Sequence, residues 1–206
     1  MSKDRSRPVL RKSRGDPPAP GADLAYSGMI DTLRAFLDQL AGAGLDEATA
    51  GALDRDLRDW TARLAPLRRE EADQMFGRIQ DTPGRGQVMS PAFTIIEQDA
   101  ASLRARVTFN RYFLGGNGAA HGGAVALMFD EILGGPANAN VRTMARTAYL
   151  HVNYRSITPI ETELEVTARI VSIDGRKRIV RGELKDGDRL CADAEGLFLE
   201  LLPGQQ

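Results

Sequence analysis

The sequence His121-Gly122-Gly123, followed by Asp130, combines residue types that could act on a carbonyl group. The first N–H groups of a helix lack intrahelical partners and carry partial positive charge. Glycines leave these amides unshielded, and amides aimed at a carbonyl oxygen form an oxyanion hole. The same residues also fit a plain interpretation, in which the glycines form a turn, His121 caps the helix and Asp130 reaches solvent.

The spacing of Gly123 and Asp130 predicts an oligomer. Seven residues separate them, so they face nearly the same way on a helix but lie about 10 Å apart along its axis. One carbonyl group cannot contact both. Two antiparallel helices in a two-fold dimer would bring the amides of one subunit to the carboxylate of the other. We therefore expect a homo-oligomer with composite sites, either a dimer or a dimer of dimers.

The segment that carries these residues, 121–134, is predicted to be a buried helix. One helical face is apolar, and Ala124 and Leu127 keep the opposite side apolar as well. The residues of the first face are Val125, Met128, Phe129 and Ile132.

Alternating apolar and polar residues predict strands around this helix. The segments are 103–109, 146–157, 163–173, 177–184 and 189–202. Asp-Gly at 174–175 and Asp-Gly-Asp at 186–188 indicate tight hairpins, and Gly196 indicates a bulge. One helix cannot cover both faces of a sheet, so we predict an α+β fold in which a curved antiparallel sheet wraps around a central helix.

The chain before this domain differs in composition. Residues 1–23 are basic and proline-rich and are predicted to form a flexible tail, either solvated or in contact with an anionic partner. Residues 24–92 are predicted to be a helical extension and a linker. Leu53, Leu57, Trp60 and Leu64 form one apolar stripe in this extension, and nearby aspartates argue against nucleic-acid binding. The remaining domain is 93–206.

Composition excludes several classes of protein. The net charge is −1, and no apolar segment approaches the roughly 20 residues that span a membrane, so we expect neither nucleic acid nor a membrane as partner. The single cysteine permits no intrachain disulfide and favours a cytoplasmic location. With two histidines in the chain, we expect no metal site.

The stretch His-Gly-Gly-Ala-Val-Ala-Leu-Met-Phe-Asp at 121–130 resembles the signature of hotdog-fold acyl-CoA thioesterases of the PaaI-like type. In that family an acid follows nine positions after the histidine. The strand segment from Thr147 to Thr158-Pro159 resembles the next strand of the family, and the resemblance covers about 93–202. Many relatives carry an asparagine six positions before the histidine, where this chain has Gly115. Asn117 could substitute for it or could be a turn residue.

The resemblance implies hydrolysis of an acyl-CoA thioester without a cofactor, since coenzyme A is part of the substrate. The amide of Gly122 or Gly123 would polarise the carbonyl, and Asp130 of the partner subunit would be a general base or a nucleophile. His121 would orient the site and Thr147 would hold Asp130 or the water. Glu131 takes the place of Asp130 if the helix register differs.

Substrate contacts and an alternative function complete the predictions. Coenzyme A phosphates need cations, and the candidates are Arg155, Arg176, Lys177 and Arg178, which also fit exposed strand charges. We expect a medium-chain or aromatic acyl group in a pocket that includes Tyr149 and Phe198. The alternative is a non-catalytic acyl-CoA sensor or regulatory hotdog protein. A hotdog hydratase would need a second Asp/His pair, which the sequence does not offer.

Overall fold

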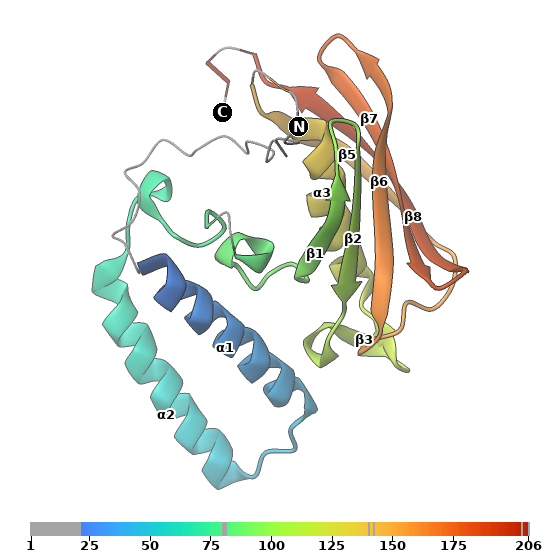
Figure 1. Ribbon diagram of the computed structural model, residues 1–206. Helices are drawn as coiled ribbons and strands as arrows, with labels where there is room; N and C mark the ends of the chain where they lie inside the picture. The colour runs from blue at the N-terminus through green and yellow to red at the C-terminus, as the bar shows by residue number, and fades with distance from the viewer. Residues whose placement is uncertain (1–21, 80–81, 140, 142, 203, 206) are drawn as a thin grey trace, which may run out of the picture. The chain divides into compact units, whose positions relative to one another are not determined.

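The computed structural model describes residues 22–79, 82–139, 141, 143–202 and 204–205 (Figure 1). Contacts divide these residues into a helical unit that ends at Gln87 and a sheet unit that begins at Val88. The predicted basic tail lies outside the described residues, apart from its last two positions.

The helical unit contains the two helices predicted from the sequence. α1 spans Ala22–Gly42 and α2 spans Glu47–Leu64, where the carboxylate of Asp46 caps α2 by accepting from the Thr49 N–H at 2.7 Å. Three short 3-10 turns follow: Ala65–Leu67, Glu71–Asp73 and Pro83–Gly86. No residue of α2 is buried, and Trp60 in its apolar stripe is 54% exposed.

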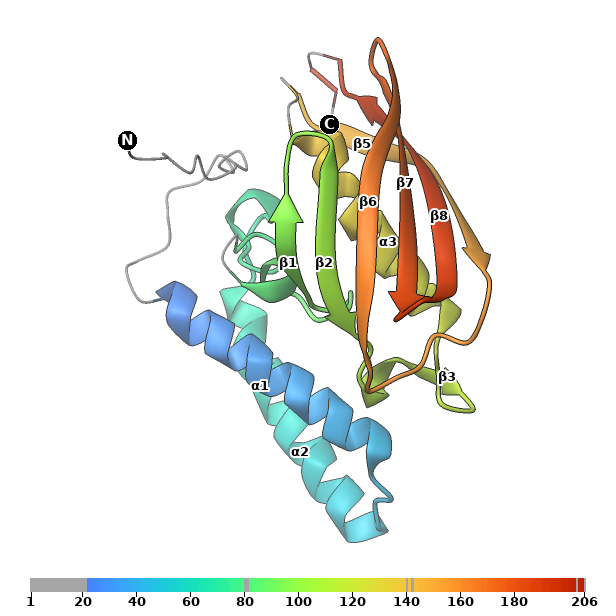
Figure 2. The same cartoon turned by 45° about the vertical axis from the view of Figure 1, so that its right-hand side comes forward.

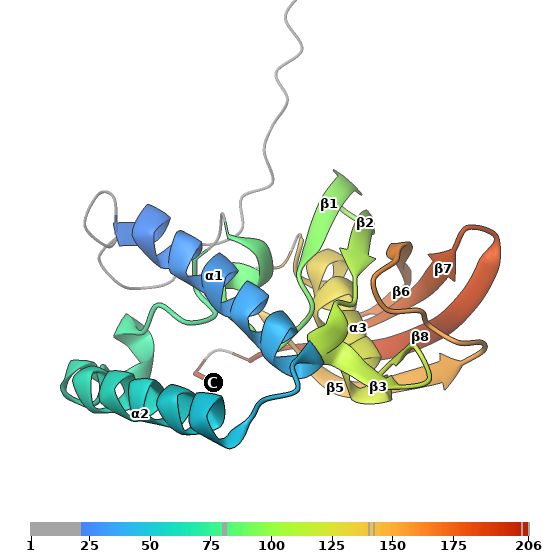
Figure 3. The ribbon, with the colours of Figure 1, turned by 90° about the horizontal axis from the view of Figure 1, so that it is seen from below.

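The sheet unit is a six-stranded antiparallel sheet in the order β1-β2-β6-β7-β8-β5, with helix α3 against one face (Figures 1 and 2). Seen from below, the sheet curves around α3 (Figure 3). The predicted α+β architecture is confirmed. Its elements are β1 Phe93–Gln98, β2 Ser102–Thr108, β3 Leu114–Gly116, β4 Ala119–Ala120, α3 Gly122–Asn138, β5 Ala145–Tyr154, β6 Glu163–Asp174, β7 Lys177–Asp186 and β8 Arg189–Glu200.

Both predicted hairpins are present because their glycines adopt positive φ angles, 54° at Gly175 and 56° at Gly187. β1 was not predicted. It is an edge strand whose four central residues are exposed, so it lacks the alternation of buried and exposed residues that marks the other strands.

The core consists of one face of α3 and the inner face of the sheet. Met128, Phe129, Ile132 and Leu133 are fully buried. The helix continues four residues beyond the predicted end, through Pro136. We attribute this extension to tertiary contacts, because Pro136 and Ala137 are buried.

Two glycines let the sheet approach α3 closely. A Cβ at Gly182 would lie 2.6 Å from the Thr167 carbonyl oxygen and 2.9 Å from Leu133. A Cβ at Gly196 would lie 2.8 Å from Phe198. The predicted bulge at Gly196 is wrong, since Gly196 pairs in regular register with Leu150 and Val180. This glycine is needed for packing space, not for an irregular backbone.

We expect Gly182→Ala to lower the free energy of unfolding by about 3 kcal/mol, because the backbone of β6 cannot move away from the added methyl group. The melting temperature should fall by about 10 °C in thermal unfolding. Gly134→Ala in α3 is the matched control. Its added Cβ would meet Phe198 at an ordinary 3.8 Å, and alanine favours a helix, so stability should stay the same or rise. Equal melting temperatures for the two variants would contradict this account.

Candidate active site

The first turn of α3 presents one unpartnered amide. His121 is the N-cap residue, and its Nδ1 accepts a hydrogen bond from the Gly123 N–H at 3.0 Å. The His121 carbonyl accepts from the N–H groups of Ala124 and Val125. Within the described residues, the Gly122 N–H makes no hydrogen bond. Of the two amides considered from the sequence, Gly122 is therefore the one available to a ligand in this conformation.

Tyr154 contacts the same turn from the end of β5. Its hydroxyl donates to the Gly122 carbonyl oxygen at 2.7 Å. Tyr154 could not be predicted from the sequence, because nothing in the alternation of β5 indicates which inward side chain meets the start of the helix.

Asp130 lies farther along α3 and accepts a hydrogen bond from the Thr147 hydroxyl at 2.8 Å. The contact expected between these two side chains is therefore present, although its part in catalysis stays a prediction. The helix register places Asp130 against β5, and Glu131 follows about 100° further around the helix.

A bulge in β5 makes this contact geometrically accessible. Leu150 and Val152 pack against the core, so regular alternation would turn the odd-numbered Thr147 to the outer face of the sheet. The register shifts between Thr147 and Tyr149, and Thr147 pairs with the inward-facing Phe198. Ala148 is the extra residue, and it returns Thr147 to the face that carries α3.

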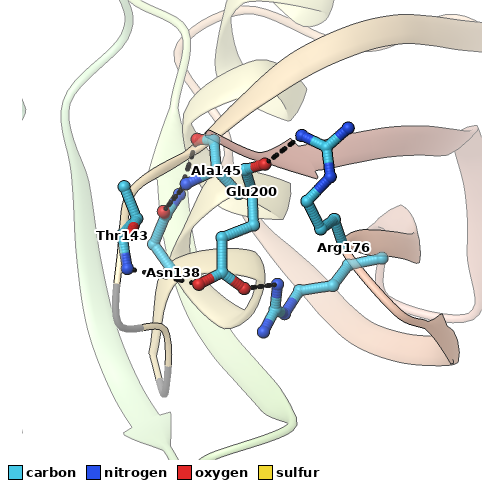
Figure 4. A network of polar contacts seen from close by, with 6 residues as sticks. Asn138, Thr143, Ala145, Arg176 and Glu200 are labelled. Carbon is cyan, nitrogen blue, oxygen red and sulfur yellow. Dashed lines mark hydrogen bonds and ion pairs between the residues drawn. The ribbon is translucent and has the colours of Figure 1, made fainter. Parts of the chain in front are cut away.

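The Asn138 side chain, at the far end of α3, is hydrogen-bonded to the backbone at the start of β5 (Figure 4). The Asn138 side chain accepts from the Ala145 N–H at 2.8 Å and donates to the Ala145 carbonyl. Glu200 accepts from the Thr143 N–H at 3.3 Å. Because α3 is held to β5 at Tyr154 and again at Ala145, the position of Asp130 between them is fixed as well.

Asn117 occupies a turn. It has φ 50° and Gly118 has φ 72°, which is the pattern of a two-residue hairpin between β3 and β4. At Gly115, an added Cβ would lie 2.9 Å from the His121 Cα. The backbone packing here leaves no room for a larger residue at 115, and Asn117 lies in the turn, while its contact with substrate stays a prediction.

Three of the four candidate cations already make hydrogen bonds or ion pairs within the described part of the chain. Arg155 pairs with Asp193 on the outer face of the sheet, opposite to α3. Arg176 donates to the Glu200 carbonyl at 2.9 Å, and Arg178, only 11% exposed, pairs with the Glu200 carboxylate at 3.1 Å. Lys177 is exposed on the same hairpin.

The outer face of the sheet carries a broad hollow of about 1310 Å³ lined by charged side chains. Tyr149 lies on this face and donates to Glu195 at 2.9 Å, so its predicted place in the acyl pocket is wrong. Phe198 is buried on the inner face as expected. Hydrogen bonds from Arg155 lower the pKa of Asp193, and those from Arg181 and Tyr149 lower the pKa of Glu195. The charged groups of Arg155, Asp193, Arg181 and Glu195 in this hollow are therefore already paired with one another.

In the part of the chain that is described, no group of three or more His, Cys, Asp or Glu side chains could hold a metal ion. None of the described helices is long and apolar enough to cross a membrane.

The curved sheet around a central helix, with a helix N-terminus and an acid facing its edge strand, defines a hotdog domain. Residues 117–192 match the family model of the thioesterase superfamily. Over these residues, the resemblance to thioesterases predicted from the sequence is confirmed.

Similar proteins agree with this assignment. Acyl-coenzyme A thioesterase THEM4 of Bos taurus is 31% identical over 94 residues, which are 45% of this chain and 38% of that protein. The chain thus spans less than half of the length of this curated relative.

Solved structures extend the comparison. The thioesterase superfamily protein RHA08564 has a TM-score of 0.72 and 27% identity, covering 87% of this chain and 96% of that chain. Our sheet unit begins at Val88, so a match of this extent includes part of the helical unit. The protein smu.793 of Streptococcus mutans UA159, solved with acetyl-CoA bound, has a TM-score of 0.52 at 18% identity over 56% of this chain and 92% of that chain, which shows the fold alone.

Proposed function

We propose that this protein is an acyl-CoA thioesterase that hydrolyses a thioester to a free acid and coenzyme A. The observation that carries the proposal is Asp130, held by Thr147 on the inner side of β5, on the same helix as the unpartnered Gly122 amide. The name of the bovine relative, acyl-coenzyme A thioesterase, supports the same reaction.

The edge position of β5 supports a composite site. β5 pairs with β8 on one side and with no other described strand. Such an edge is a template for pairing with a second chain. Antiparallel pairing about a two-fold axis at His151, with the bulge residue Ala148 left out of the register, would place Thr147 opposite the partner subunit's Tyr154. Since Thr147 contacts Asp130 and Tyr154 contacts Gly122, this dimer would bring Asp130 close to the Gly122 amide of the partner subunit.

The proposed reaction needs no cofactor. The Gly122 N–H donates to the thioester carbonyl oxygen and stabilises the oxyanion as it forms. Asp130 either takes a proton from the attacking water or attacks the carbonyl carbon to give an anhydride, which water then opens. The carbon–sulfur bond breaks in both routes, and the coenzyme A thiolate is protonated on release. Nδ1 of His121 accepts from Gly123, so His121 orients the turn and does not serve as the base at that atom.

Cations for the coenzyme A phosphates belong to the same proposal. A phosphate at Arg155 or Arg178 would compete with the carboxylates that these residues already pair with. Lys177 is exposed, so it is the member of the group that we expect to contact a phosphate first, with Arg176 beside it. Asn117, in the turn between β3 and β4, and Glu131, on α3, stay in the proposal as candidate substrate contacts.

A panel of acyl-CoA thioesters assayed by thiol release tests the function directly. We expect turnover of at least one medium-chain or aromatic acyl-CoA. Tight binding of the esters with no release of thiol from any of them would refute the thioesterase and favour the sensor.

Coexpression of two inactive variants tests the composite site. Asp130→Asn and Gly122→Pro each damage a different half, so a mixed dimer retains one intact site. Random pairing makes half of the dimers mixed, and the mixture should recover about a quarter of the wild-type activity. Activity no higher than that of the separate variants would show that each site is built from one subunit.

A further inference from the structure

One peptide group at the start of α3 is held at both ends. Its carbonyl oxygen, on Gly122, accepts from the Tyr154 hydroxyl at 2.7 Å. Its N–H, on Gly123, donates to His121 Nδ1 at 3.0 Å. Hydrogen bonds joined through one peptide group polarise and strengthen one another. His121 belongs to the cap of the helix, whereas Tyr154 comes from a strand, so the peptide is tied to both elements.

Two adjacent glycines need such a restraint. Glycine adopts more backbone conformations than any other residue, and a side chain at either position would normally limit them. An oxyanion hole stabilises charge only if its donors point at the oxygen before the reaction begins. The direction of the Gly122 N–H depends on the backbone torsions on either side of it. The Gly122–Gly123 peptide is hydrogen-bonded at both its carbonyl and its N–H, which restricts the torsions of Gly122.

We propose that Tyr154 is a positioning residue for the oxyanion hole, acting through the Gly122 carbonyl on the Gly122 amide. The inference rests on the proposed thioesterase function. Tyr154 does not contact the reacting atoms in this arrangement. Its hydroxyl lies where a Cβ on Gly122 would be 3.1 Å from it, so the glycine also makes room for the hydrogen bond.

Tyr154→Phe tests the proposal by removing only the hydroxyl. We expect kcat to fall about five- to tenfold, the effect of one lost hydrogen bond, with KM nearly unchanged. Tyr149→Phe is the matched control. Tyr149 lies on the same strand and also donates one hydrogen bond, to Glu195, but on the outer face. It should keep wild-type kcat. Equal losses in both variants, or none in Tyr154→Phe, would overturn the proposal.

A double variant gives a readout that a merely structural role would not change. Once Gly122→Pro has removed the amide, adding Tyr154→Phe should lower kcat no further, because the group that Tyr154 positions is gone. Independent, multiplying losses would overturn the proposal.

Hydrogen exchange at the Gly123 amide separates this inference from the proposed function. Exchange should be several-fold faster in Tyr154→Phe than in the wild-type protein and unchanged in Tyr149→Phe. If the wild-type protein hydrolysed no thioester, the proposed function would fail, whatever the exchange rates. If exchange at Gly123 were unchanged in Tyr154→Phe, the inference that Tyr154 restrains this peptide would fail, whatever the activity.

Discussion

Asp130→Asn should lower kcat about 1,000-fold while the protein still binds acyl-CoA, since a general base typically contributes 10²–10⁴ in rate. The amide keeps the size of the side chain, and its oxygen can still accept from the Thr147 hydroxyl. Packing around α3 should therefore be retained, and only the ability to take a proton or to attack carbon is lost. Thiol-release kinetics and calorimetric titration with a non-hydrolysable acyl-CoA analogue measure the two properties separately.

Glu131→Gln distinguishes the two acids of the helix. If it, and not Asp130→Asn, abolished turnover, the catalytic acid would be Glu131, and the Thr147 contact would be structural. If neither variant lost activity, the chemistry would not depend on this turn of α3. A loss of binding that parallels the loss of turnover in Asp130→Asn would indicate damage to the site as a whole.

Gly122→Pro should lower kcat by 10²–10³, because proline has no N–H and removes the one unpartnered amide of the helix start. The backbone can accept the change. Gly122 is the first residue of α3, where proline is favoured, and His121 has φ −60° and ψ 131°, which suits a residue before proline. Steady-state kinetics on the acyl-CoA turned over best should show the loss in kcat more than in KM.

Gly122→Ala is the control for this substitution. It adds the same Cβ near the Tyr154 hydroxyl but keeps the N–H. A small loss is expected, as the hydroxyl moves by a few tenths of an ångström. If alanine were as harmful as proline, the steric contact would explain the effect, and the oxyanion assignment would have to move to another donor.

Much of the sheet could be predicted because its strands alternate and its turns carry glycine at positive φ. β1 could not, because an exposed edge strand has no apolar face to give a period of two. The helix end was underestimated for a related reason. Pro136 argues locally for a stop, and only the packing of α3 against the sheet outweighs it.

Some features of the candidate site could be predicted from the sequence, and others could not. The local features, such as a helix that begins at His-Gly-Gly and an acid on its later turn, follow from neighbours in the chain. Arg155 was predicted to contact the substrate, which stays a prediction, and only the structure shows that it lies on the outer face with Asp193. The face of the sheet to which Arg155 points depends on the alternation of side chains along the strand. That alternation can be assigned from the sequence only if the strand ends and bulges are known.

The sequence by itself determined the class of fold, the start of α3 and the spacing of Gly122 and Asp130, because helix period, strand alternation and turn chemistry are properties of residues close in the chain. The tertiary structure alone decided that Thr147 faces inward and that Tyr154 meets Gly122. Both depend on which residue of another element lies opposite, and a single extra residue, Ala148, reverses the outcome.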